Sequence, residues 1–161
     1  MPPRRSKTAA EFVRELQRDP QYVARQAVLR AEAEQRAAAI AQDEAPLVRE
    51  LAESGIDVRS VWDFGTLVTP PAAVPIVLRH LTLTHHPRVR EGLIRALAYS
   101  HLRAQALEPL KEFFRSESDP DVRWLLANSL AAMAKYREVS DLVGIAEFRG
   151  LFRLTPQSRI P

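Results

Sequence analysis

The side chains of this 161-residue chain that could hold a metal ion are its four histidines, His80, His85, His86 and His101. Protein zinc sites use histidine, cysteine and carboxylate ligands, and the chain contains no cysteine. No aspartate or glutamate lies at ligand spacing among the histidines, and adjacent histidines in a turn rarely share one ion. We therefore predict no metal site, no cofactor, and histidines that lie on the surface.

Residue types used in catalysis are present, but their arrangement supports no reaction. Asp119 and Asp121 flank Pro120, which is typical of a helix start, where a carboxylate accepts hydrogen bonds from free backbone amides. The five glycines are scattered singly, so the sequence has neither a phosphate-binding loop nor the glycine-rich setting of a nucleophile elbow. The sequence predicts a protein that is not an enzyme.

Composition indicates an ordinary soluble chain. Hydrophobic residues make up 46% and charged residues 27%, and the net charge is only +3. No segment approaches the roughly 20 apolar residues that cross a bilayer, and the basic start is not followed by an apolar signal region. We expect no membrane segment and a cytoplasmic location.

An internal repeat organises the second half of the chain. Residues 86–90, His-Pro-Arg-Val-Arg, lie 33 positions before residues 119–123, Asp-Pro-Asp-Val-Arg. The correspondence continues downstream, where Leu97 aligns with Leu130. Apolar residues recur at helical spacing on both sides of each copy, so each copy is predicted to be a pair of helices with the proline opening the second one.

Two helices are expected before the repeats. Thr8 and Glu11 match a capping box, and Asp19 with Pro20 is typical of the start of another helix. That helix is predicted from residue 21 to about 42, since it is rich in strong helix formers. Its apolar seam is narrow, which leaves three alternatives: it docks on its own domain, projects as an arm, or forms a homodimer through residues 20–43.

Further boundaries follow from proline, glycine and aromatic residues. Pro46 is expected to interrupt the long helix or to begin a new one, which stops at Gly55. Trp62 and Phe64 belong to an apolar cluster that would cover the end of the stack. A last helix is expected over residues 137–148, followed by a tail that is extended or poorly ordered.

These helical pairs resemble HEAT repeats, and in particular the short HEAT-like repeats of bacterial proteins. The likeness is carried by Asp-Pro-x-Val-Arg at 119–123 and by Leu126 and Leu130, whereas ankyrin and tetratricopeptide signatures are missing. It covers residues 71–134 well and 135–149 in part. The resemblance implies an all-α fold, a short right-handed α-solenoid of helical hairpins with a long N-terminal helix.

The expected organisation has four parts. They are an N-terminal arm with the long helix (1–55), an apolar capping connector (56–70), HEAT-like repeats (71–149) and a C-terminal tail (150–161). In such repeats the arginine that follows the proline stacks neighbouring units, so we predict structural roles for Arg90 and Arg123.

Second helices of HEAT-like units line the concave side of the solenoid, so positions that differ between the two copies there are candidates for function. Glu91 aligns with Trp124, which indicates an exposed position, because a buried one would not hold a charge. Trp124 can alternatively cover the last half-repeat near Tyr136. The predicted partner-binding residues are Arg88, Glu91, Arg95, Tyr99, Trp124 and Asn128.

Two functions follow from this surface. The first is a non-enzymatic module that binds another protein on its concave face, because arginine, tyrosine and tryptophan are enriched at binding hot spots. The alternative is nucleic-acid binding, as in HEAT-like DNA glycosylase scaffolds, since residues 71–100 contain four arginines and one acidic residue. The small charge excess makes this alternative the weaker one. The four arginines are Arg79, Arg88, Arg90 and Arg95.

Overall fold

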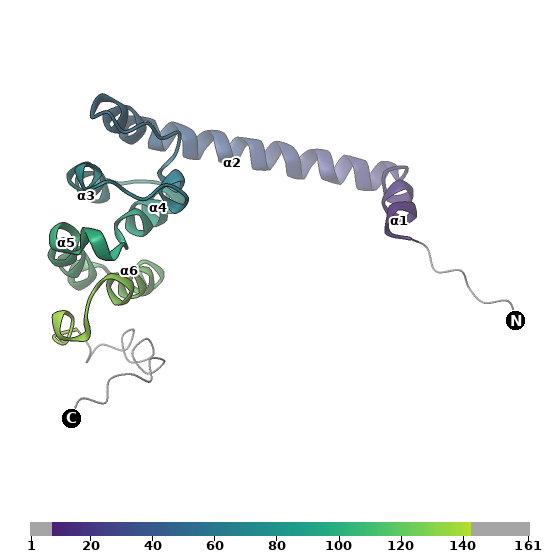
Figure 1. Ribbon diagram of the computed structural model, residues 1–161. Helices are drawn as coiled ribbons and strands as arrows, with labels where there is room; N and C mark the ends of the chain where they lie inside the picture. Colours follow the sequence, from purple (N-terminus) through teal and green to yellow (C-terminus); the bar gives the residue numbers. More distant parts are fainter. Residues whose placement is uncertain (1–7, 143–161) are drawn as a thin grey trace, which may run out of the picture. The chain divides into compact units, whose positions relative to one another are not determined.

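The computed structural model describes residues 8–142, apart from the side chain of Tyr136. Every regular element in that range is a helix, which confirms the all-α prediction (Figure 1). The chain divides into two compact units, residues 1–39 and 40–161. The predicted tail at 150–161 lies outside the described residues.

The first unit contains α1 (Ala9–Leu16) and the first part of α2 (Pro20–Glu53). The predicted capping box is confirmed, because Glu11 Oε2 accepts from the Thr8 amide at 2.9 Å and Thr8 Oγ1 accepts from the Glu11 amide at 3.3 Å. Hydrogen bonds that the Thr8 amide and the Thr8 hydroxyl donate to the Glu11 carboxylate lower the pKa of Glu11. Asp19 caps α2 by accepting from the amide of Gln21 at 2.9 Å. No described residue of this unit is buried.

The expected interruption at Pro46 is wrong, because α2 continues through it to Glu53. Proline fits helical backbone angles, but it removes the hydrogen bond to the carbonyl of Gln42 and its ring crowds that carbonyl. Both residues are exposed, so water can reach that carbonyl. The helix ends at Glu53, and Gly55, with a φ of +78°, provides the predicted left-handed stop just after it.

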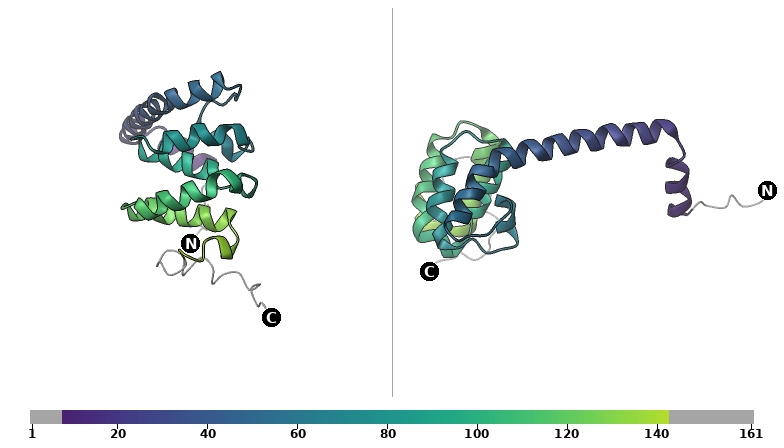
Figure 2. Two further views of the ribbon diagram at one scale, coloured as in Figure 1. Left: turned by 90° about the vertical axis from the view of Figure 1, so that its left-hand side faces the viewer. Right: turned by 90° about the horizontal axis from the view of Figure 1, so that it is seen from above.

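The described part of the second unit contains two stacked helical hairpins. The first comprises α3 (Val74–Leu81) and α4 (Pro87–Leu97), and the second comprises α5 (Arg103–Ser116) and α6 (Pro120–Met133). Helix α3 contacts α5, and α4 contacts α6, so first helices form one layer and second helices another (Figures 1 and 2). Short 3-10 turns join them: η1 (Val61–Gly65), η2 (Pro71–Ala73), η3 (Ser100–Leu102) and η4 (Tyr136–Glu138).

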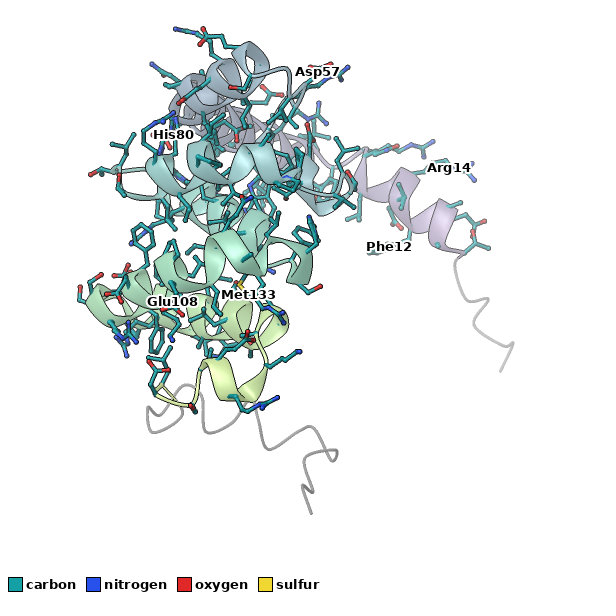
Figure 3. All side chains as sticks on the ribbon, turned by 60° about the vertical axis from the view of Figure 1, so that its left-hand side comes forward. Phe12, Arg14, Asp57, His80, Glu108 and Met133 are labelled. Atoms are coloured by element: carbon teal, nitrogen blue, oxygen red, sulfur yellow. The ribbon has the colours of Figure 1, made fainter. Side chains whose placement is uncertain are left out.

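One continuous core fills the space between the two layers. Leu93 and Leu97 of α4 and Leu130 of α6 are fully buried, and Met133 is 2% exposed. Figure 3 shows the side chains on these helices, with Met133 labelled. The last part of α2 joins this core, which shows that residues 40–53 cover the first end of the stack. Its fully buried residues are Leu47 and Leu51.

The two repeat arginines join neighbouring segments, as expected for structural residues. Arg90 forms an ion pair with Glu117 in the next hairpin. Arg123 differs, because it donates to the carbonyl oxygens of Phe114 and Glu117 in its own hairpin, both at 3.0 Å. The ion pair of Arg90 therefore links one repeat to the next.

The helix expected at residues 137–148 is not formed in its described part. Residues 136–138 make the single turn η4, residues 139–142 are not helical, and 143–148 lie outside the described residues. Lys111 of α5 donates to the carbonyl of Glu138 at 3.0 Å and lies 3.3 Å from Asp141. These contacts hold the segment against α5 and bury Val139.

None of the described helices is both long and apolar enough to span a membrane.

Gly92 of α4 allows η1 to pack closely against that helix. A Cβ atom there would lie 2.4 Å from Val61 Cγ1, and Val61 is itself 1% exposed. We expect Gly92→Ala to lower the free energy of unfolding by about 1–3 kcal/mol, despite alanine's better helix propensity. Urea unfolding measures this. Gly65→Ala is the matched control, because a Cβ at Gly65 meets nothing within 4 Å; equal losses for both variants would contradict the packing explanation.

Candidate functional site

Four of the six predicted partner-binding residues line one hollow on the layer of second helices. They are Arg95 and Tyr99 from the end of α4 and its following turn, and Trp124 and Asn128 from α6. The hollow measures about 450 Å³ and also includes Gly65 at the end of η1. We call the surface formed by η1, α4 and α6 the second-helix face.

Stacking of the two hairpins explains why these residues meet. Because α4 and α6 are equivalent helices 33 positions apart, Arg95 and Asn128 occupy the same place in successive repeats. Asn128 Nδ2 donates to the carbonyl of Trp124 at 2.8 Å, one turn earlier. The Tyr99 hydroxyl donates to the carbonyl of Phe64, which ties the turn after α4 to η1. The hollow is therefore built on hydrogen-bonded, helical supports.

Trp124 is the most unusual residue of this hollow. It remains 57% exposed, although a large aromatic side chain is favourably buried. This exposure argues against the alternative in which Trp124 covers the last half-repeat. The indole instead offers apolar area that a partner can bury.

The other two predicted residues, Arg88 and Glu91, lie beside the hollow and connect to it through ion pairs. Glu91 accepts from Arg88 at 2.6 Å and from Arg95 at 3.0 Å. Burial opposes ionisation of Glu91, but the hydrogen bonds and charges of the two arginines outweigh it and lower its pKa. Arg88 also lies 4.0 Å above the ring of Trp62.

Trp62 is a residue of this face that sequence reasoning assigned only to the cover at the end of the stack. Phe64 is 1% exposed and covers the core as expected, whereas Trp62 is partly buried beneath Arg88. Because η1 lies before both copies of the repeat, comparing the two copies could not predict that Trp62 lies on this face.

The expectation of surface histidines is wrong for two of the four. The side chains of His80 and His85 are only 6% and 5% exposed. Both lie where the last part of α2 meets the turn between α3 and α4, which the sequence pattern did not bring together. Among the described residues, no three histidine, cysteine or acidic side chains are grouped as ligands for a metal ion.

The two tryptophans provide a direct test of this geometry. We expect Trp62→Phe, which leaves Trp124, to retain emission that acrylamide quenches strongly, and Trp124→Phe to leave weakly quenched emission. Arg88→Ala in the Trp124→Phe background should increase quenching, because it uncovers Trp62. Equal quenching of the two tryptophans would contradict the described surface.

Comparison with known proteins supports the architecture seen here. The family model described as HEAT repeats matches residues 33–131, which is more than half of the chain. No curated protein and no solved structure matches the chain. The matched region includes the end of α2, η1, the hairpin α3–α4 and most of α5–α6. The chain thus belongs to the HEAT-repeat family.

Proposed function

We propose that this protein is a non-enzymatic module that binds a segment of another protein on its second-helix face. HEAT repeats generally mediate protein–protein interactions. The observation that carries the proposal for this chain is the half-exposed Trp124, which lies in one hollow with Arg95 and Tyr99.

The chemistry of the hollow suits a protein partner. Tryptophan, tyrosine and arginine are the residue types that contribute most at hot spots, where truncation commonly costs 2 kcal/mol or more (~30-fold in affinity). Ala98 and Ala132 leave space between the larger side chains. Because α4 and α6 carry most of the hollow, little backbone conformational entropy of this chain is lost when a partner binds.

The charges of this region favour a protein over a nucleic acid. Each of the four arginines at residues 71–100 forms an ion pair: Arg79 with Glu50, Arg88 and Arg95 with Glu91, and Arg90 with Glu117. Binding to phosphates would require these arginines to exchange a carboxylate partner for a phosphate. Intramolecular pairing thus weakens the case for the nucleic-acid alternative.

Affinity capture with single variants tests the proposal. We expect Trp124→Ala and Arg95→Glu each to reduce recovery of a specific protein partner by at least about 10-fold, because each alters the hollow. Leu83→Ala and Arg49→Glu are matched controls, since both positions are exposed and neither lines the hollow. Circular dichroism should show all four variants folded.

Two results would contradict the proposal. In one, Trp124→Ala and Arg95→Glu retain the same partners as the wild type. In the other, the purified wild type is retained on duplex DNA at about 50 mM salt and released as salt increases, which is the signature of phosphate binding.

A homodimer through α2 is a separate proposal about partners. Val23, Val28 and Leu29 are 48%, 58% and 47% exposed and lie within the predicted 20–43 seam. We expect the wild type to sediment as a dimer at micromolar concentration and Leu29→Glu as a monomer, with Gln26→Glu as a charge control. A wild type that remains monomeric would contradict the homodimer proposal, but it would not bear on partner binding at the second-helix face.

A further inference from the structure

Four titratable side chains form a row where the last part of α2 meets the first hairpin. His80 Nε2 lies 3.0 Å from Glu50 Oε2, His80 Nδ1 lies 3.4 Å from His85 Nε2, and His85 Nδ1 lies 3.0 Å from Asp43 Oδ2. The centroids of the two imidazole rings lie 5.5 Å apart, and the ring planes differ by 28°. The row therefore has a carboxylate at each end and two histidines between.

The row lies largely out of solvent. The side chains of His80 and His85 are 6% and 5% exposed, and those of Glu50 and Asp43 are 31% and 29% exposed. Buried polar groups are costly when they lack a hydrogen-bond partner. The number of protons on the two rings therefore affects how stably α2 packs here.

Counting hydrogens identifies the preferred protonation state. Three contacts need one hydrogen each, and two neutral imidazoles carry only two hydrogens, so one contact would lack a hydrogen. Two imidazolium rings carry four hydrogens, so an N–H group of each ring would point at the other across the central contact, and neither nitrogen could accept. Three hydrogens, or one positive charge on the pair, satisfy every contact.

We propose that His80 and His85 share a single positive charge between Glu50 and Asp43, and that this charge state locks the last part of α2 onto the α3–α4 hairpin in a pH-dependent manner. The lock joins residues 40–53, which cover the core with Leu47 and Leu51, to the turn after α3. It goes beyond the proposed binding function, because it concerns a different surface.

The neighbouring charges are consistent with one shared charge. Glu50 also pairs with Arg79, and Asp43 Oδ2 also accepts from the backbone amide of His86 at 2.9 Å. The His86 side chain is directed to α4, where its Nδ1 accepts from the amide of Arg88 at 3.1 Å.

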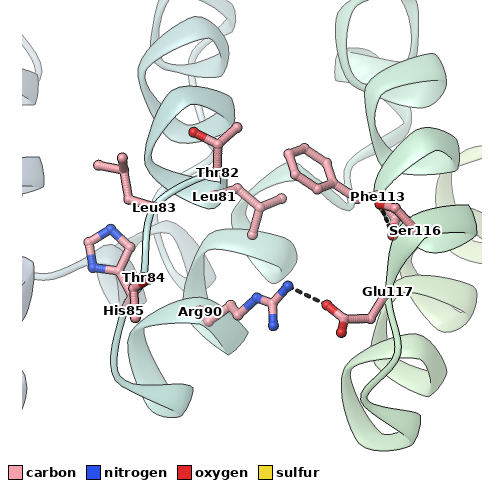
Figure 4. A pocket seen from close by; sticks show the side chains of 9 residues that line it. All are labelled: Leu81, Thr82, Leu83, Thr84, His85, Arg90, Phe113, Ser116 and Glu117. Atoms are coloured by element: carbon pink, nitrogen blue, oxygen red, sulfur yellow. Dashed lines mark hydrogen bonds and ion pairs between the residues drawn. The ribbon is translucent and has the colours of Figure 1, made fainter.

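A hollow beside His85 contains a further ion pair. Arg90 of α4 and Glu117 line the same hollow as His85 and are bound to each other (Figure 4). This pair balances its own charge and leaves Asp43 as the acidic partner of His85.

Uptake of a second proton is opposed on His80. Burial, the charge of His85 and the charge of Arg79 together lower the pKa of His80 below its ordinary value of 6.5. An opened state in which His80 is solvated binds that proton more readily than the closed state. The lock therefore weakens as the pH falls from about 6.5 toward the lowered pKa of His80. Loss of the shared proton at higher pH also weakens it, because two neutral rings leave one of the three contacts without a hydrogen.

Hydrogen exchange of the full chain, corrected for intrinsic rates, measures this directly. We expect the opening equilibrium of amides in residues 43–53 to increase by up to about tenfold per pH unit below pH 6.5, because opening takes up one proton. His85→Gln should flatten this dependence, since no second ring then shares the charge. His101→Gln is the control, because His101 lies outside the row and binds the carbonyl of Thr69.

A long-range ¹H–¹⁵N spectrum of the wild type keeps the proposal testable if His85→Gln does not fold. At pH 7 it should show one imidazolium charge over the His80–His85 pair. Two neutral rings, a flat exchange profile in the wild type, or an unchanged profile in a folded His85→Gln variant would overturn the proposal. Stoichiometric Zn²⁺ that shifts both rings at pH 7 would also overturn it and identify a metal site.

Discussion

The structure of the second unit depends on one constraint: a helical hairpin can bury its apolar face only against another element. The hairpins α3–α4 and α5–α6 satisfy each other, and the last part of α2 covers the open end with Leu47 and Leu51. Glu44, 5% exposed, accepts hydrogen bonds from Ser60 Oγ at 3.0 Å and the Val61 amide at 3.2 Å, which fastens η1 to this cover.

Once the core is satisfied, the differences between the two copies decide what the surface can do. The shared leucines of α4 and α6 are buried, whereas Glu91 and its counterpart Trp124 are on the second-helix face. His86 and Asp119 both cap their second helices, so that difference preserves the same local function with different chemistry. The difference between Glu91 in the first copy and Trp124 in the second does change the surface, and it underlies the proposed binding role.

The sequence was sufficient for features that depend on local pattern. Helical periodicity and the 33-residue offset predicted the hairpins, and capping residues predicted their starts, because both act within one or two turns of helix. It was insufficient where distant segments meet. His80 is buried where it contacts Glu50, 30 positions away. Val139 is buried because Lys111 of α5 holds the neighbouring carbonyl of Glu138. The prediction of a helix break at Pro46 was wrong because the free-energy cost of proline in a helix depends on whether water reaches the carbonyl of Gln42, which the sequence does not show.

Photo-crosslinking from the second-helix face tests the central claim most directly. A benzophenone side chain replaces Asn128, which lines the hollow, or Arg49, which is exposed on α2 and does not. The proposed function predicts a discrete covalent adduct with one polypeptide from position 128 and none with that polypeptide from position 49. The same adduct from both positions, or none from position 128, would contradict it.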